Sequence, residues 1–234
     1  MEPYILKEFT LISFANSLLI LSAGRGIGLD GFHKLNLVAP SSRETILDRY
    51  RRQLSTDTSI VVGYRAPELM SLYPEFQYHY NYNWFETGSA FSAAIGLKKV
   101  PVIVLPSDLF LDEAAAEVVR NATGNIIFTS NTENRSTSAI NVSTDKGTVH
   151  EIYSGPKRRG DDVEFKGIVL IQDFELLTAL VASCEDNPSM AFSDCLEMHK
   201  EAFRAVDTGG LVTEINAVED YMEFFDKDMS NADS

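Results

Sequence analysis

The sequence predicts an α/β protein in which helices cover both faces of a mostly parallel, mixed sheet. Short β-branched runs alternate with amphipathic stretches in the first half of the chain. In much of the second half, similar runs are joined by turns of Asn, Asp and Gly. With 234 residues and 44% hydrophobic composition, the chain is long enough for one large core.

In the first half, four short apolar runs are typical of buried strands: residues 17–21, 59–63, 76–80 and 101–106. Three amphipathic segments predict helices: residues 41–54, 88–99 and 111–124. The serines at the start of the first segment suit an N-cap, and Gly124 suits a C-cap of the third. Strands separated by helices imply a parallel sheet, with a ligand crevice at the carboxyl ends of its strands.

In the second half, four runs predict strands joined by turns: residues 125–130, 137–144, 147–154 and 163–172. These strands predict a small β-hairpin extension of the sheet. Helices are expected from about residue 174 to 205 and over 217–227, with a short strand at 212–215. We expect a single domain over residues 1–228 and a polar, frayed tail over 229–234.

Charge and cysteine content narrow the classes of partner. The formal net charge of -14 argues against nucleic acid or an anionic membrane surface, because both repel an acidic protein. Cys184 and Cys195 lack metal-ligand spacing and predict no disulfide framework, which suits a reducing cytoplasm. The apolar N-terminal stretch is interrupted by Lys7, Glu8 and Asn16, so we expect neither a signal peptide nor a membrane anchor.

A glycine-rich turn, "LSAGRGIG", follows the first predicted strand, and Lys34 comes after it. Backbone amides of such a turn, together with the lysine, suit the oxygens of a phosphate group. A turn that only connects two elements has the same composition, so both interpretations remain open. The turn is not a Walker loop, because no Lys-Ser or Lys-Thr follows the last glycine. The residues after Gly28 do not indicate a helix start, which argues against a dinucleotide fingerprint.

Two polar side chains follow predicted strands at the edge where the crevice should lie. Asp108 and Asn216 are therefore candidate ligands for Mg²⁺, which takes one or two protein oxygens together with substrate phosphates. Each also has a structural alternative. Asp108 would cap a helix beginning near Leu109 or Leu111, and Asn216 would be an N-cap with Glu219 as its capping-box partner.

Two further turns carry polar or charged residues. Thr87, Gly88 and Ser89 precede a predicted helix and suit either hydrogen bonds to a base or ribose, or a helix cap. Lys157 and the two arginines after it form a basic cluster between predicted strands. Such a cluster is ordinarily a solvated loop, but in an acidic chain it would serve an anionic substrate.

The order of these motifs is more specific than any one of them. It runs from "LSAGRGIG...K" through "IVVGY", "YN..W.ETGSAFSA" and "VLPSD" to a lysine in a hairpin and "EIN..EDY". This order resembles the nucleotidyltransferases of the sugar-phosphate and phosphocholine cytidylyltransferase type, including those with a molybdenum-cofactor-like domain, over residues 18–225. The resemblance implies a Rossmann-like three-layer sandwich of the nucleotide-diphospho-sugar transferase type.

The resemblance also implies roles for individual residues. Lys34 and Arg25 would hold the triphosphate, and Lys157 would receive the acceptor's phosphate. Asp108 and Asn216 would hold Mg²⁺. The nucleotide-binding residues that it implies are Ser22, Ala23, Gly24, Gly26, Gly63, Thr87, Gly88 and Ser89. Where the family has Thr or Ser followed by an arginine that helps to hold the triphosphate, this sequence has Ile27 and Gly28, so Arg25 is the candidate substitute.

The activity that the resemblance implies is transfer of a nucleoside monophosphate from a nucleoside triphosphate, with release of pyrophosphate. CTP is favoured over UTP, and the acceptor would be a small phosphate or phosphonate such as phosphocholine or a sugar 1-phosphate. Three alternatives remain: a non-catalytic nucleotide-binding module, a guanylyltransferase of the molybdenum-cofactor branch, and a nucleotide-sugar-dependent glycosyltransferase. The last is disfavoured because "PSDLFLD" lacks an Asp-x-Asp motif. A homodimer is left open.

Overall fold

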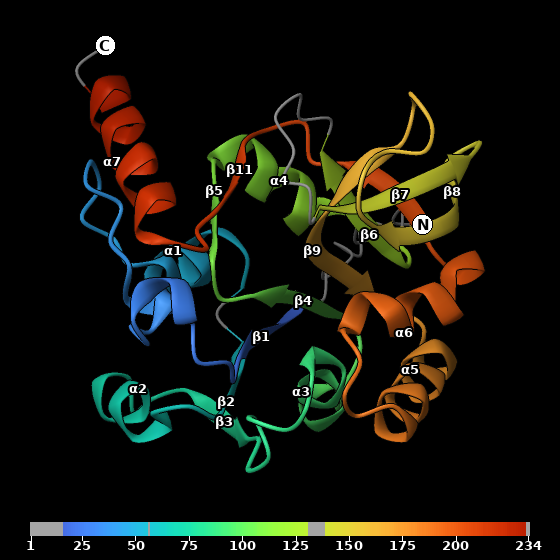
Figure 1. Ribbon diagram of the computed structural model, residues 1–234, viewed down its shortest axis with the longest axis horizontal. Helices are drawn as coiled ribbons and strands as arrows, with labels where there is room; N and C mark the ends of the chain where they lie inside the picture. Colours follow the sequence, from blue (N-terminus) through green and yellow to red (C-terminus); the bar gives the residue numbers. More distant parts are fainter. Residues whose placement is uncertain (1–15, 56, 131–138, 233–234) are drawn as a thin grey trace, which may run out of the picture.

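The computed structural model describes residues 16–55, 57–130 and 139–232, which form helices on both sides of a central sheet (Figure 1). Its nine strands lie in the order β3-β2-β1-β4-β9-β6-β10-β8-β7. In chain order these are β1 (Ser17–Ser22), β2 (Thr58–Val62), β3 (Gln77–Tyr80), β4 (Val102–Pro106), β6 (Ile126–Ser130), β7 (Ile140–Asp145), β8 (Thr148–Ser154), β9 (Val163–Ile171) and β10 (Arg204–Asp207). A separate pair consists of β5 (Leu109–Leu111) and β11 (Val212–Glu214).

The sheet is mixed, as predicted. Strands β3, β2, β1 and β4 are parallel neighbours, and β10 runs parallel to β6. Between these two groups, β9 pairs antiparallel with β4 and β6. The β7–β8 hairpin extends the far edge. The carboxyl ends of β1 and β4 therefore lie side by side, which brings the residues that follow them to one place.

The helices are α1 (Ile46–Gln53), α2 (Ala66–Leu72), α3 (Ser89–Gly96), α4 (Glu113–Asn121), α5 (Phe174–Asp186), α6 (Phe192–Met198) and α7 (Val218–Ala232). Short 3-10 helices occur at Ile27–Leu29, Lys34–Asn36 and Lys200–Ala202. Helix α1 begins with a capping box, in which Thr45 and Asp48 exchange side-chain and backbone hydrogen bonds. No helix within the described ranges is long and apolar enough to cross a bilayer.

The core has two parts, one on each face of the sheet. Because side chains alternate along a strand, Leu18 and Ile20 of β1 face α1 and α4, whereas Leu19 faces the other layer. That second layer contains α3, α5 and α6, which lie together on one side of the sheet in Figure 1. The predicted α/β class with helices on both faces is confirmed.

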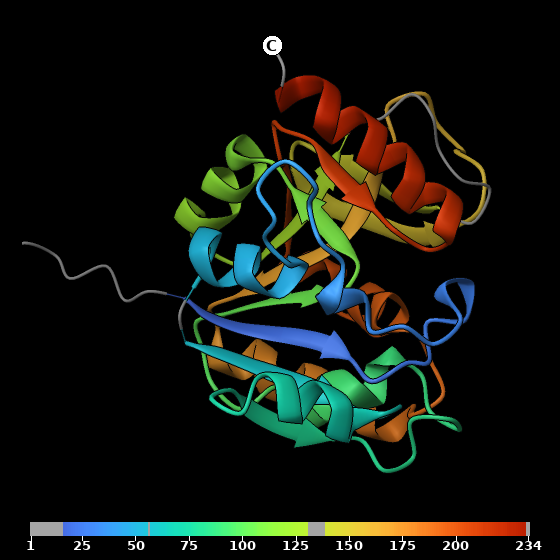
Figure 2. The ribbon, with the colours of Figure 1, turned by 90° about the vertical axis from the view of Figure 1, so that its left-hand side faces the viewer.

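Some predicted boundaries are wrong. The expected helix over 174–205 divides into α5 and α6 and ends in β10, which pairs with β6. Helix α7, the red helix in Figure 2, continues to Ala232, so most of the expected tail is helical. The N-cap of α1 is Thr45 and not a serine, and the C-cap of α4 is Ala122 and not Gly124.

Helix α2 and strand β5 were not predicted from the sequence. Parts of other predictions lie outside the described residues: the N-terminal apolar stretch before residue 16, the start of the strand at 137–144, and residues 233–234.

Candidate nucleotide-binding site

Lys34 joins three segments that lie far apart in the sequence. Its ammonium nitrogen donates hydrogen bonds to Asp108 Oδ2 at 2.9 Å and to Asn216 Oδ1 at 3.1 Å. The side chains of Lys34 and Asp108 are only 13% and 16% exposed. The structure therefore brings together the lysine after the glycine turn and the two polar residues at strand ends.

Asp108 does not cap a helix, which overturns the structural alternative for this residue. The residues after it form β5, which pairs with β11, and helix α4 begins later with Asp112 as its N-cap. The fully buried Tyr50 holds the turn around Asp108: its hydroxyl donates to the Pro106 carbonyl and accepts from the Leu109 amide, both at 3.1 Å. Burial, with a contribution from the charge of Asp108, raises the pKa of Tyr50 well above its usual range, so this hydroxyl keeps its proton.

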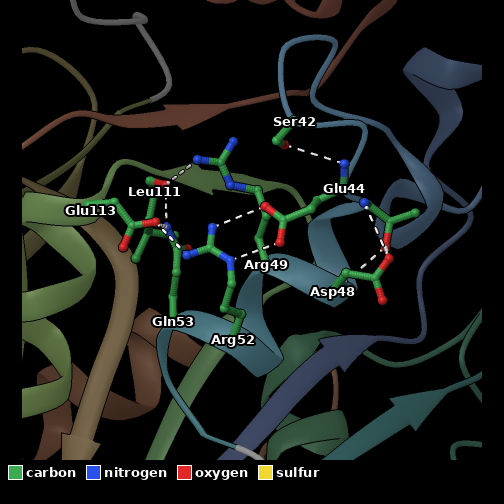
Figure 3. Close-up of polar contacts among 9 residues, drawn as sticks. Ser42, Glu44, Asp48, Arg49, Arg52, Gln53, Leu111 and Glu113 are labelled. Carbon is green, nitrogen blue, oxygen red and sulfur yellow. Dashed lines mark hydrogen bonds and ion pairs between the residues drawn. The ribbon is translucent and has the colours of Figure 1, made fainter.

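Helix α1, which carries Tyr50, is fixed to the β5 edge by polar contacts (Figure 3). The Leu111 carbonyl accepts hydrogen bonds from Arg49 and Gln53, and Arg52 binds Glu113 at 2.6 Å and Glu44 at 2.8 Å. These contacts connect the helix to the segment that begins at Asp108. Tyr50 on α1 is thereby held against the turn that carries Asp108.

Asn216 does not use its side chain as a helix cap. Its amide nitrogen donates to Glu214 Oε1 at 2.7 Å, while its amide oxygen faces Lys34. The helix start is capped from within α7, where Asp220 Oδ2 accepts from the backbone amides of Asn216 and Ala217 at 2.8 Å. Glu219 is therefore not the capping partner, and the side chain of Asn216 faces Lys34 instead of capping the helix.

The glycine turn borders a cavity of about 180 Å³ that reaches Lys34 and Asp108. Of the predicted nucleotide-binding residues, Ser22, Gly24 and Gly26 line it, as does Arg25. The Arg25 guanidinium lies 5.8 Å from the centre of the Tyr64 ring, which forms another wall. Ala23 is buried beneath this turn, and its carbonyl accepts from the Tyr64 amide at 3.0 Å.

The other predicted nucleotide-binding residues do not line this cavity. Gly63 packs closely against Trp84, and Gly88 against the backbone of Met190. The hydroxyl of Thr87 donates to the Asn83 carbonyl at 2.9 Å. Ser89 accepts from the Phe192 amide at 2.8 Å and borders a different cavity. A nucleotide role for these four residues remains a prediction, and the predicted helix-capping role fits Gly88, the N-cap of α3.

That second cavity, of about 210 Å³, lies on the other side of Pro106 and is mainly apolar. Leu21 and Pro106 border both cavities. The additional lining includes Phe165, Gly167 and Phe192. The two cavities thus meet at the carboxyl ends of β1 and β4.

The structure does not bring Lys157 into contact with the Lys34 cluster, which consists of Lys34, Asp108 and Asn216. Lys157 is exposed on the turn between β8 and β9, where its ammonium donates to the Gly160 carbonyl at 3.3 Å. By contrast, Lys166 on β9 is nearly buried and forms an ion pair with Glu164 at 3.0 Å. The sequence analysis missed this pair, although two charged residues at alternate positions of an apolar strand were a signal for it.

Charged groups from several segments, Lys166 among them, act on the pKa of Glu214. The pKa of Glu214 is raised, chiefly because surrounding protein desolvates its carboxylate, although the residue as a whole is exposed. The hydrogen bond from Asn216 lowers this pKa, the charge of Asp108 raises it, and the charges of Lys166 and Lys34 lower it. The packing of β9 agrees, because a Cβ atom at Gly167, the residue after Lys166, would lie 3.1 Å from the Pro106 ring.

The donor set at this place fits a magnesium ion. Asp108 Oδ1 is buried and has no hydrogen-bond partner among the described residues, so one carboxylate oxygen remains for a ligand. No group of three or more His, Cys, Asp or Glu side chains in the described ranges is arranged to hold a metal. An ion here would thus need other oxygens, from the Asn216 amide or from substrate phosphates.

Comparison with known proteins gives relatives by structure only. No family model matches the sequence, and no curated protein matches it significantly. The CTP:phosphocholine cytidylyltransferase of Streptococcus pneumoniae superposes with a TM-score of 0.73 at 15% identity, over 91% of this chain and 99% of that one. The inositol-1-phosphate CTP transferase of T. maritima gives 0.71 at 16% identity, over 92% and 96%.

A third solved structure, a UDP-glucose pyrophosphorylase complexed with UDP-glucose, gives a TM-score of 0.70 at 13% identity, over 92% of this chain and 99% of that one. The chain therefore has the Rossmann-like fold of nucleotide-diphospho-sugar transferases, with its Lys34 cluster at the carboxyl ends of β1 and β4.

Proposed function

We propose that this protein is a nucleotidyltransferase, which transfers a nucleoside monophosphate from a nucleoside triphosphate to a small phosphorylated acceptor. The observation that carries the proposal is the contact of Lys34 with Asp108 and Asn216, next to a cavity bordered by a glycine turn. This arrangement combines phosphate-binding amides, a cation and oxygen ligands at one strand edge. The fold of the solved nucleotidyltransferases supports it.

The triphosphate would lie along the glycine turn. Backbone amides near Gly24 and Gly26 are suited to its oxygens, and Arg25 at the cavity wall supplies a second positive charge. An ammonium group has three donors, and Lys34 uses two of them on Asp108 and Asn216. The third donor is then available for a phosphate oxygen, so one lysine would connect the nucleotide with both oxygen ligands.

Asp108 and Asn216 would hold Mg²⁺, the former through its Oδ1, which has no partner in the described part of the chain. A bound magnesium ion would neutralise charge on the phosphates of the substrates. The chain's own task is to hold the two anions in line and to keep positive charge where negative charge develops.

In the reaction, an anionic oxygen of the acceptor forms a bond to the α-phosphorus, and the bond from that phosphorus to pyrophosphate breaks. The nucleophile is already ionised, so no general base is required. We favour Lys166 over Lys157 as the residue that receives the acceptor's anionic group, because Lys166 is nearly buried and the residue after it, Gly167, packs against Pro106 at the candidate site. The apolar cavity beside Pro106 would accept the rest of the acceptor.

CTP is the favoured donor, with UTP as the alternative. Two of the solved structures with this fold are named as CTP-dependent transferases, and a third is complexed with UDP-glucose. The acceptor would be phosphocholine, a phosphonate or a sugar 1-phosphate.

A pyrophosphate-release screen tests this function. Each of the four common ribonucleoside triphosphates would be combined with phosphocholine, 2-aminoethylphosphonate and several sugar 1-phosphates, with and without Mg²⁺. We expect turnover with at least one pair, and a loss of roughly 10²-fold in Lys34→Ala, the scale of one preorganised charge contact. Absence of turnover with every pair would contradict the proposal.

A second candidate function is a nucleotide-binding module without catalysis. The observation that favours it is the pair Ile27 and Gly28, which stand where the resembling family has a hydroxyl and an arginine. Calorimetric titration of CTP and UTP with Mg²⁺ separates the two functions. Binding without turnover on any acceptor would support the module.

A further inference from the structure

The side-chain amide of Asn216 lies between a cation and an anion. Its oxygen accepts from the Lys34 ammonium at 3.1 Å, and its nitrogen donates to Glu214 Oε1 at 2.7 Å. The same lysine binds Asp108 Oδ2 at 2.9 Å. Four side chains therefore form one chain of hydrogen bonds, in which Glu214 is the terminal acceptor.

Only one orientation of this amide satisfies both neighbours. A half-turn of the terminal group would put its NH₂ against the Lys34 ammonium and its oxygen against the Glu214 carboxylate. Each contact would then join two donors or two acceptors, in place of two charge-assisted hydrogen bonds. Glu214 and Lys34 together thus determine which end of Asn216 faces Asp108.

The surrounding backbone fixes the position of Asn216 but leaves this rotation free. Strand β11 pairs with β5, so that Glu214 lies opposite Leu109. The Ile215 amide donates to the Asp108 carbonyl at 2.9 Å, and the Asn216 amide is bound by Asp220. These backbone contacts hold the segment beside Asp108, and the orientation of the side-chain amide is left to its side-chain partners.

The amide needs an orienting partner because residue 216 is an asparagine and not an aspartate. Both oxygens of an aspartate accept hydrogen bonds or bind a metal, so a half-turn of a carboxylate changes nothing. An amide has one oxygen and one donor nitrogen, and only the oxygen is useful to a cation. A partner that accepts from the nitrogen keeps the oxygen on the opposite side.

We propose that Glu214 is a positioning residue that holds the amide oxygen of Asn216 toward Lys34 and Asp108. The value of this orientation for magnesium binding rests on the proposed function, whereas the orientation itself does not. Partners that orient metal ligands commonly change metal affinity or activity about 10- to 100-fold when they are removed. Glu214 is expected to act on this scale, without contacting the substrates.

The test is a double-mutant cycle of Glu214→Ala and Asn216→Asp, read by Mn²⁺ or Mg²⁺ binding in calorimetry and by turnover. Glu214→Ala alone should weaken metal binding about 10- to 100-fold. Asn216→Asp alone should place a second carboxylate against that of Glu214. Because the two carboxylates repel each other, metal affinity should rise little. In the double variant, the carboxylate needs no orienting partner and the repulsion is gone, so metal binding should return to at least the wild-type value.

Two further variants separate positioning from general effects. Glu214→Gln keeps an acceptor oxygen for the Asn216 nitrogen and should retain most of the metal affinity. Glu219→Ala removes an equal charge from the exposed start of α7 and should change nothing. Equal losses in Glu214→Ala with either residue at position 216 would overturn the proposal, because a structural role of Glu214 would not depend on that residue.

A readout without metal or substrate distinguishes this inference from the proposed function. In ¹⁵N-labelled protein, the side-chain NH₂ signals of Asn216, assigned by their absence in Asn216→Asp, should exchange slowly with solvent, and Glu214→Ala should speed this exchange. Fast exchange already in the wild type would overturn the positioning role. Slow exchange that depends on Glu214, in a protein with no turnover in the screen, would uphold the positioning role and reject the transferase.

Discussion

The backbone of Gly28 lies directly against the carbonyl oxygen of Asn216, so that a Cβ atom at position 28 would come within 2.2 Å of it. The glycine turn and the segment before α7 thus pack with no room for a side chain. Gly28 does not have a positive φ, so the requirement for glycine is one of space. The arginine that the resembling family has at this position cannot be accommodated here without moving Asn216.

We therefore predict that Gly28→Arg lowers activity and does not restore a missing phosphate contact. Gly28→Ala should also lower activity, because the first side-chain atom already causes the clash. A loss of about 10-fold or more in metal affinity or turnover is expected, on the scale of disturbed ligand orientation. Ile27→Arg is the matched control, since Ile27 is 82% exposed. Full activity of Gly28→Arg would show that the turn shifts freely.

Tyr50→Phe should destabilise the protein and weaken the site together. The change removes a hydroxyl that bonds Pro106 and Leu109, and it leaves a partly buried carbonyl and a buried amide without this partner. Such a loss costs about 1–3 kcal/mol in the free energy of unfolding. Because the same bonds hold the turn that carries Asp108, metal affinity should fall as well.

Urea unfolding and metal titration measure these two effects. Tyr221→Phe is the control, because it removes the same atom from a hydroxyl that donates to the Val38 carbonyl at 2.8 Å and not to the Asp108 turn. It should lower stability and leave metal affinity unchanged. If Tyr50→Phe behaves like Tyr221→Phe, Tyr50 does not position Asp108.

The sequence predicted the long, periodic elements of this fold better than the short ones. An apolar run such as "LFL" is too short for periodicity to separate strand from helix. It becomes strand β5 because β11, about a hundred residues later, pairs with it. Similarly, "RAVD" ends a helical-looking region but forms β10 because β6 offers an open edge.

The residues of the candidate site also differ in whether the sequence predicts them. Asp108 could be selected because it follows β4, whose carboxyl end lies beside that of β1. Asn216 was selected by the same rule, but β11 before it pairs antiparallel with β5 in a separate sheet, so a different pairing brings it to Asp108. Lys34 was selected for its place after the glycine turn. The contacts of Asn216 with Glu214, and of Tyr50 with the Asp108 turn, depend on side-chain packing between distant segments. No spacing in the sequence predicts them. Lys157 was chosen from the basic cluster and from the order of motifs, whereas burial on β9 favours Lys166.

The ion pairs of Arg52 with Glu44 and Glu113 predict a pH-dependent stability (Figure 3). The hydrogen bonds from Arg52 lower the pKa of both carboxyl groups below the ordinary 4.5. A carboxyl with a lowered folded-state pKa stabilises above its unfolded-state pKa, and this stabilisation is lost as the pH falls through the folded-state value.

Arg52→Gln should thus lower the free energy of unfolding at pH 7, by less than about 1 kcal/mol per pair because the pairs are exposed. Its difference from the wild type should shrink as the pH falls below 4.5 and also in high salt. Arg43→Gln removes an exposed charge from the same region and should show no such pH dependence. A constant difference between pH 7 and pH 3 would mean that Arg52 acts by packing.

Lys166→Met and Lys157→Met decide which lysine receives the acceptor. Lys166 is nearly buried and lies on β9 one residue before Gly167, which packs against Pro106. Its loss should raise the KM for the acceptor by about 10-fold or more, with a smaller change in the KM for the nucleoside triphosphate. Lys157 is exposed and bonds only a neighbouring turn carbonyl in the described structure, so its loss should change both constants little. Because Lys166→Met leaves Glu164 buried, Glu164→Gln/Lys166→Met serves as the stability control. A raised acceptor KM in Lys157→Met alone would restore the assignment from the motif order and reject Lys166.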